Sequence, residues 1–172
     1  IPRVTDKLKI ASPELKVSFI EALSRTNNPA LIPSFLSAAE DPQENVRIEA
    51  LKAMGKLADA RALPAVIRAI GKATGKELEA AKNAVVFIPG EDVVDRLIAE
   101  QTNTDTRGRV ELLRAVATRR SEKVIPALKG ITMGFNPVLR VEGLRLLKNL
   151  AREQDLTFLL NILIGTKIEK ER

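Results

Sequence analysis

A seven-residue segment recurs along this 172-residue chain at multiples of about 31 residues. Residues 46–52 read Val-Arg-Ile-Glu-Ala-Leu-Lys, and similar segments return at residues 108–114 and 139–145. Weaker copies of the segment lie at residues 15–21 and 77–82. Pro33, Pro64 and Pro126 follow the same spacing of 31 residues or a multiple of it. A fixed period of this length is typical of a chain that stacks one small structural unit, so it constrains the fold more than any other feature.

Each copy has the pattern of two short helices. In the best copy, Asp41 and Pro42 suit a cap and a first helical position, and apolar residues then recur at helical spacing. A second helix is predicted over residues 60–71, capped by Asp59 and kinked at Pro64. Further cap signals are Ser12-Pro13, Asn28-Pro29, Asn103-Thr104-Asp105 and Asn136-Pro137. No segment alternates with period two, so we expect an all-α protein of about ten short helices.

The best copy also carries a family pattern: Asp41, Pro42, Val46, Arg47, Ala50, Leu51, Ala53, Met54, Gly55, Leu57, Asp59, Ala62, Leu63 and Pro64. This pattern resembles the HEAT repeat, in the short form common in bacterial HEAT-like proteins. Asp41 and Arg47 match the family's characteristic residues of the inner helix, and Pro64 matches the proline of the outer helix. The resemblance implies a right-handed α-solenoid of about five helix pairs with a long concave surface. The resemblance says little about activity, because the family spans transport receptors, phosphatase scaffolds, chromophore-lyase subunits and a DNA-repair branch. The long concave surface of a solenoid favours a protein-binding or scaffolding role.

The repeat predicts one domain over residues 1–172. Its five copies are expected at residues 8–39, 41–71, 74–101, 105–133 and 136–168. In the family an outer helix precedes each inner helix, so the first inner helix here would lack its partner. This supports an excised fragment or an unusual N-terminal cap. The chain also begins at Ile1 rather than Met, so it is either processed or cut from a longer chain, and we expect a fragment of a larger protein.

A cation falls on the apolar face of each of four inner helices. Arg47 lies one turn before Leu51, and the matching cations are Lys16, Arg109 and Arg140. Burying a charge is costly unless it is paired, so we expect the Asp41 carboxylate or carbonyls of the adjoining repeat as acceptors. We interpret this set as a structural ladder that fixes repeat register. The positions equivalent to Asp41 hold Ile10, Gly71, Asn103 and Gly134, so the family's acid is only partly present.

The polar faces of the inner helices carry a second ladder, in which a cation follows a glutamate by three residues. The four pairs are Glu49 and Lys52, Glu79 and Lys82, Glu111 and Arg114, and Glu142 and Arg145. One interpretation is four surface ion pairs, each stabilising its helix by about 0.2–0.5 kcal/mol. The other is an alternating-charge groove on the concave face that holds a polar or helical segment of a partner protein. These eight residues are therefore candidate partner contacts.

The net charge of +6 comes entirely from residues 105–172, which hold 14 Lys+Arg and 8 Asp+Glu. Arg107, Arg119 and Arg120 join the candidate contacts if the partner is acidic. An alternative function is binding to the nucleic-acid backbone through these Arg-rich repeats. The base-excising branch of HEAT-like proteins is disfavoured, because the chain has no Trp or Tyr to stack on a base.

The chain also lacks Cys and His, which excludes disulfides, thiolate or imidazole metal sites, and Ser-His or Cys-His catalysis. We expect no cofactor and no enzymatic activity. The longest nearly apolar stretch, residues 156–165, is about half the roughly 20 residues that a membrane-spanning helix needs. We therefore expect a soluble protein without membrane insertion, and favour the cytoplasm as its compartment.

Overall fold

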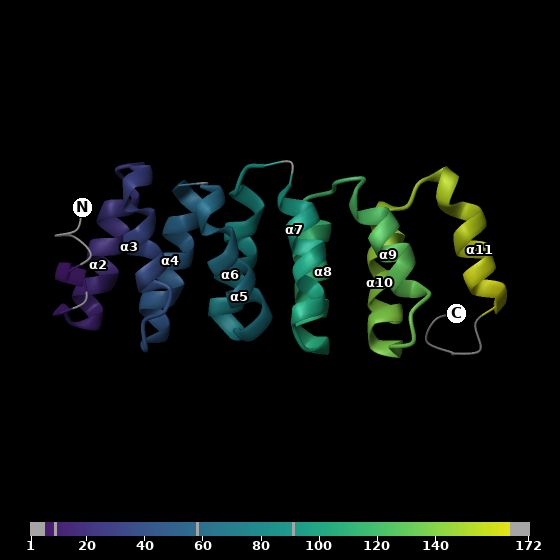
Figure 1. The fold of residues 1–172 in the computed structure, drawn as a ribbon, viewed down its shortest axis with the longest axis horizontal. Helices are drawn as coiled ribbons and strands as arrows, with labels where there is room; N and C mark the ends of the chain where they lie inside the picture. The colour runs from purple at the N-terminus through teal and green to yellow at the C-terminus, as the bar shows by residue number, and fades with distance from the viewer. Residues whose placement is uncertain (1–5, 9, 58, 91, 166–172) are drawn as a thin grey trace. The chain divides into compact units, whose positions relative to one another are not determined.

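The computed structural model describes residues 6–165, with the exception of residues 9, 58 and 91. This part of the chain consists of helices and short connections and contains no β-strand, which confirms the all-α prediction (Figure 1). The α-helices are α2 (Pro13–Ser24), α3 (Ile32–Ala38), α4 (Glu44–Leu57), α5 (Leu63–Lys72), α6 (Gly75–Phe87), α7 (Val93–Glu100), α8 (Thr106–Thr118), α9 (Val124–Thr132), α10 (Pro137–Leu150) and α11 (Leu156–Gly165). Four 3₁₀ helices lie between them: η1 (Pro29–Leu31), η2 (Ala60–Ala62), η3 (Gln101–Asn103) and η4 (Glu153–Asp155).

Most of the predicted caps lie where the sequence placed them. The Ser12 hydroxyl accepts a hydrogen bond from the Leu15 N–H at the start of α2. The Asp105 carboxylate accepts one from the Gly108 N–H at the start of α8, over 2.7 Å. The side chains of Asn28, Asp59 and Asn136 cap η1, η2 and α10 in the same way. Each cap satisfies a backbone donor that the first helical turn leaves without a partner.

Two local predictions were wrong. Asp41 does not cap α4, because the helix begins only at Glu44 and the Asp41 carboxylate instead accepts from the Gln43 N–H in the preceding turn. Pro64 does not kink a helix, because a 3₁₀ turn precedes it and α5 begins at Leu63. Pro64 thus occupies the first turn of α5, where its missing N–H leaves no helical hydrogen bond unmade.

The expectation that the first inner helix lacks a preceding helix also needs correction. Residues 6–8 and residue 10 are helical, and Leu8 is buried. Leu8 of this segment therefore contributes to the core ahead of α2.

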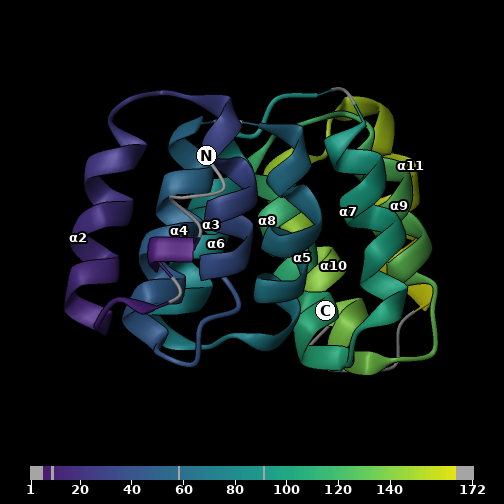
Figure 2. The ribbon, with the colours of Figure 1, turned by 60° about the vertical axis from the view of Figure 1, so that its left-hand side comes forward.

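The chain divides into two compact units, Ile1–Val93 and Val94–Arg172. In the first unit, α4 packs against α2 on one side and against α6 on the other, while α3 packs on α4 and α5 on α6. Figure 2 shows α2 and α4 side by side in this unit. In the second unit, α10 packs against both α8 and α9. The helices that pack on their counterparts in the next repeat are α2, α4 and α6, and α8 and α10; we call these the inner helices.

One close helix contact in the first unit is made at a glycine. A Cβ atom added to Gly55 of α4 would lie 2.8 Å from the Cα of Ala84 on α6. Around this point the core is built from small and branched side chains such as Ala53, Ala81 and Val85, all fully buried. Small residues let two helices approach closely, so Gly55 sets the spacing of the inner helices here.

Candidate functional site

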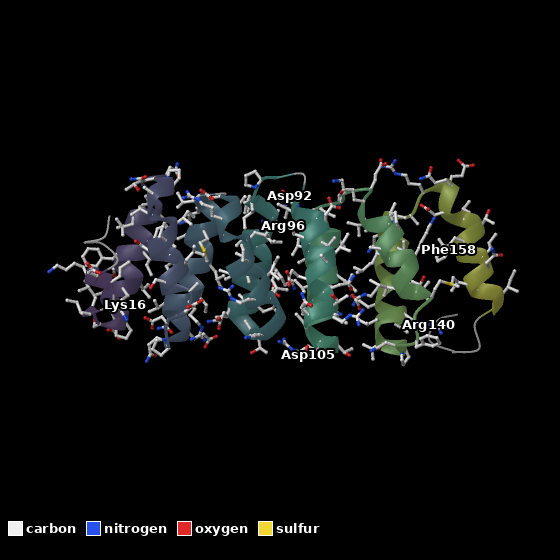
Figure 3. All side chains as sticks on the ribbon, in the orientation of Figure 1. Lys16, Asp92, Arg96, Asp105, Arg140 and Phe158 are labelled. Carbon is white, nitrogen blue, oxygen red and sulfur yellow. The ribbon has the colours of Figure 1, made fainter. Side chains whose placement is uncertain are left out.

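The cations on the apolar faces of α2 and α4 each reach into the next repeat. Lys16, labelled in Figure 3, forms an ion pair with Asp41 over 2.7 Å. Arg47 forms a two-pronged pair with Glu77, with Nε and Nη2 at 2.8 and 2.7 Å from the two carboxylate oxygens. The Nη1 of Arg47 also donates to the backbone carbonyls of Asp41 and Pro42. Each cation therefore ties one inner helix to the segment that follows it.

Sequence reasoning missed Glu77 as the acceptor for Arg47. Glu77 lies 30 residues further along the chain, in the first turn of α6, within the most degenerate copy of the repeat. The sequence feature that could have identified it is an acidic residue in the first turn of the next inner helix. The helix dipole also favours negative charge at that end of a helix. The hydrogen bonds to Glu77 raise the pKa of Arg47 above its ordinary value, although burial opposes this.

The two corresponding arginines of the second unit have different surroundings. Arg109 on α8 forms no ion pair with any described residue, and its buried Nε has no hydrogen-bond partner among them. Arg140 on α10, labelled in Figure 3, is half-buried beside a separate cavity that includes Phe158. In the first unit each cation of the predicted ladder is thus paired with an acid. Arg109 has no acidic partner among the described residues.

All four glutamate–cation pairs predicted on the polar faces are present. In the first unit, Lys52 lies 3.1 Å from Glu49, and Lys82 lies 2.9 Å from Glu79. In the second unit, Arg114 lies 2.8 Å from Glu111, and Arg145 lies 3.7 Å from Glu142. At the exposed members, Lys52 and Glu79, solvent screens the attraction, so these pairs contribute little to stability.

The expectation of an exposed charge ladder was wrong for Glu111 and Glu142, which are both buried. Arg114 explains why, because it binds Glu111 through Nη1 and both oxygens of Glu142 through Nε and Nη2. It thereby joins α8 to α10 with a charge-assisted fork that satisfies two buried carboxylates. In the second unit these residues hold neighbouring repeats together.

Acidification should weaken the second unit through Glu142. Hydrogen bonds from Arg114 hold the pKa of Glu142 below its ordinary value of 4.5, although burial opposes this. A carboxyl whose pKa is lowered on folding stabilises the protein above its unfolded pKa, and this contribution is lost as the pH falls through and below that value. Urea unfolding at about pH 7, 5 and 3.5 should show the loss, and Glu142→Gln should reduce the slope between the two lower values. An identical slope in that variant would contradict this assignment. Some slope should remain, because Asp41, Asp59 and Asp155 also have lowered pKa values.

The three additional arginine candidates do not form one cluster. Arg107 lies in the first turn of α8, whereas Arg119 and Arg120 lie just past its other end. Twelve residues of helix separate Arg107 from Arg119 by about 18 Å. Arg107 and Arg120 are exposed, and Arg119 is half-buried. Nucleic-acid binding through these residues stays a prediction.

A groove runs between α4 and α6 on the side that carries Lys52 and Glu79. It encloses about 960 Å³, and most of its lining is apolar. Its residues are Ile48, Lys52, Gly55, Lys56, Gly75, Lys76, Leu78, Glu79, Ala80, Asn83, Ala84 and Phe87. Sequence reasoning found only Lys52 and Glu79 of this set, because the groove depends on how two helices 31 residues apart pack together.

Two further properties of the described residues bear on function. They contain no group of three or more acidic side chains placed to hold a metal ion. Within the same residues, no helix has the length and apolar character to cross a membrane.

Comparison with known proteins supplies the remaining evidence. No curated protein matches the chain. Residues 1–85 match the model of a family described as HEAT repeats, whose members are commonly protein-interaction scaffolds. The match covers the inner helices α2, α4 and nearly all of α6, together with the Lys16–Asp41 and Arg47–Glu77 pairs. Residues 1–85 of the chain therefore belong to the HEAT-repeat family.

Proposed function

We propose that this chain is a non-enzymatic interaction module that binds a segment of another protein in the groove between α4 and α6. The observation that carries the proposal is an apolar groove bordered by two lysines, Lys56 and Lys76, that have no acidic partner among the described residues. The segment that fits such a groove has apolar side chains on one face and carboxylates beside them.

The apolar part of the groove supplies the affinity. Ile48, Leu78 and Phe87 all line it, and Phe87 keeps 66% of its surface exposed. Covering apolar surface stabilises a complex by about 25 cal/mol for each Å² removed from water. A helix that lays its apolar face into a groove is a recurrent way to gain this energy.

The charge of the groove selects an acidic segment. Lys56 makes a 3.5 Å hydrogen bond to the Ser24 hydroxyl and no ion pair, and Lys76 forms no ion pair with any described residue. Lys52 is paired with Glu49 but remains half exposed. Glu79 is the one acid in the lining, and Lys82 neutralises it. The groove therefore has an excess of positive charge, which complements carboxylates on a partner.

Reversing the two lysines that lack acidic partners should abolish binding of acidic peptides. Random 16-residue peptides displayed on phage would be selected on the chain, and the selected sequences synthesised with a fluorescent label. We expect them to combine Asp or Glu with Leu or Phe, and Lys56→Glu/Lys76→Glu should weaken their binding at least tenfold. Fluorescence anisotropy measures this loss, and the label is needed because the chain has no Trp or Tyr.

The matched control is Arg25→Glu/Arg68→Glu, which changes the net charge equally. Both of these arginines are exposed, belong to surface ion pairs and lie outside the groove. Selected peptides that bind the control and the groove variant equally well would overturn the proposal. Arg114 is unsuitable for such a test, because its reversal would remove the two short hydrogen bonds that it donates to Glu142 and destabilise the second unit.

A further inference from the structure

Two cavities of this chain are built from the same repeat positions, three periods apart. Seven residues that line a cavity in the first unit have counterparts 93 residues later in a cavity of the second unit. The pairs that differ most are Leu8 and Gln101, Ser37 and Gly130, and Asp41 and Gly134. Lys16 of the first cavity corresponds to Arg109 of the second. The two cavities thus occupy equivalent positions in two repeats, and we call them the first and second versions of one site. Differences in their volume and charge therefore arise from the residues that differ.

In the first version an internal ion pair fills the site. The Lys16 ammonium lies 2.7 Å from the Asp41 carboxylate, and the side chains of both residues are largely buried. The remaining cavity is only about 30 Å³, roughly the volume of one water molecule. This version is therefore closed and neutral.

In the second version the acid is missing and the site is open. Gly134 stands at the position of Asp41, so no carboxylate faces Arg109 from this turn. Gly130 stands at the position of Ser37, and a Cβ added there would meet nothing within 4 Å. The cavity has grown to about 410 Å³, within the range of sites that bind small molecules.

The enlarged cavity is lined by two buried polar groups that have no hydrogen-bond partner among the described residues. The buried Nε of Arg109 has no hydrogen-bond partner, and its guanidinium forms no ion pair with any described residue. Gln101 is only 6% exposed, and its buried Oε1 has no hydrogen-bond partner in the part of the chain that the structure describes. It stands where the first cavity has the apolar Leu8. A buried polar group without a hydrogen-bond partner costs about 1–3 kcal/mol of stability. A ligand that forms hydrogen bonds with both Arg109 and Gln101 would remove both costs, which would favour its binding.

We propose that the cavity beside Arg109 binds a carboxylate carried on an apolar group. The guanidinium fork matches the two oxygens of a carboxylate, and the ligand would replace the acid that Asp41 supplies in the first unit. Ile98, Ile131 and Leu139 line the same cavity and would cover an apolar body. The Gln101 amide offers a donor and an acceptor, and rotation about its last bond would turn its N–H₂ toward a carboxylate oxygen.

The same carboxylate chemistry has two sources, a free small acid or an acidic side chain of a partner protein. The probes are 3-phenylpropionate for the first source and a capped peptide with a single glutamate, Ac-Leu-Glu-Phe-NH₂, for the second. Each is paired with its uncharged amide, 3-phenylpropionamide or the Gln peptide. Binding is measured by saturation-transfer NMR on the ligands at about pH 7, where both carboxylates are ionised.

We expect at least one carboxylate to bind ten times or more tightly than its amide. Binding of the small acid alone identifies a free ligand, and binding of the peptide alone identifies a protein side chain. Equal binding of acids and amides, or no binding of either acid, would overturn the proposal. None of the cavity's lining residues lies in the α4/α6 groove, so this result is independent of the function proposed for that groove.

Restoring the missing acid provides the sharpest variant. Gly134→Asp should place a carboxylate opposite Arg109, raise the melting temperature and abolish carboxylate binding. Gly134→Asn is the matched control, since both variants add a Cβ 3.2 Å from the Ile131 carbonyl oxygen and differ mainly in charge. The Asn variant should keep measurable carboxylate binding. Arg109→Met should lose binding without a fall in melting temperature, and binding that survives in both Arg109→Met and Gly134→Asp would contradict the assignment.

Discussion

Replacing Arg47 with Met should lower the melting temperature of the chain by about 4–8 °C, which corresponds to about 2 kcal/mol. The substitution removes all four hydrogen bonds of the guanidinium and leaves the Glu77 carboxylate without its cation. Breaking a fully buried ion pair costs about 3–5 kcal/mol, and the residual exposure of the two side chains, 25% and 14%, lets water recover part of this. Circular dichroism at 222 nm measures the shift.

Two further variants show whether the loss comes from the orphaned carboxylate. Arg47→Met/Glu77→Leu removes both charges and should recover a substantial part of the stability, because no buried charge is left unpaired. Arg109→Met should not lower the melting temperature, because Arg109 has no acidic partner among the described residues. If Arg47→Met leaves the melting temperature unchanged but abolishes peptide binding, then Arg47 acts in recognition and the structural role is wrong.

Gly55→Leu should destabilise the first unit by about 3 kcal/mol, at the upper end of what overpacking costs. The new Cβ would lie 2.8 Å from the Ala84 Cα and 3.1 Å from its Cβ. The backbone atom cannot move aside as a flexible side chain does, so α4 and α6 must separate. Helix propensity alone predicts that Gly55→Leu would stabilise the protein, since leucine is favoured over glycine within a helix by about 0.8 kcal/mol. Urea unfolding at constant pH measures the change.

A matched pair of alanine variants isolates the steric cause. Gly55→Ala meets the same Ala84 atoms, whereas a Cβ at Gly130 in α9 meets nothing within 4 Å. Gly130→Ala should therefore stabilise by about 0.5–1 kcal/mol, and Gly55→Ala should lose stability. A gain in both variants would show that the helix contact at Gly55 is loose. Because Gly55 also lines the α4/α6 groove, the Leu variant should bind the selected peptides more weakly.

The sequence alone was sufficient for the helical class and for most helix starts. The 31-residue period and the caps at Ser12, Asp59 and Asn136 are local signals, because a cap bonds to a backbone N–H two or three residues away. The pairing of each glutamate with a cation three residues later is local in the same sense, and all four pairs are present. The single domain over residues 1–172 and the right-handed superhelix stay predictions.

Only the tertiary structure decided which charged side chains join neighbouring repeats and which remain exposed. Glu142 and Glu79 hold the same repeat position, yet Glu142 is buried against Arg114 and Glu79 is exposed. Likewise, Arg47 and Arg109 share one position, but the Glu77 carboxylate pairs with Arg47, whereas Leu139 stands 30 residues after Arg109. The partners lie 28–30 residues apart, beyond the reach of any helical pattern. A helical period specifies the face of the helix on which a residue lies, but not the side chain that packs against that face. Burial and pairing depend on that second side chain, which the adjoining repeat must bring within about 3 Å.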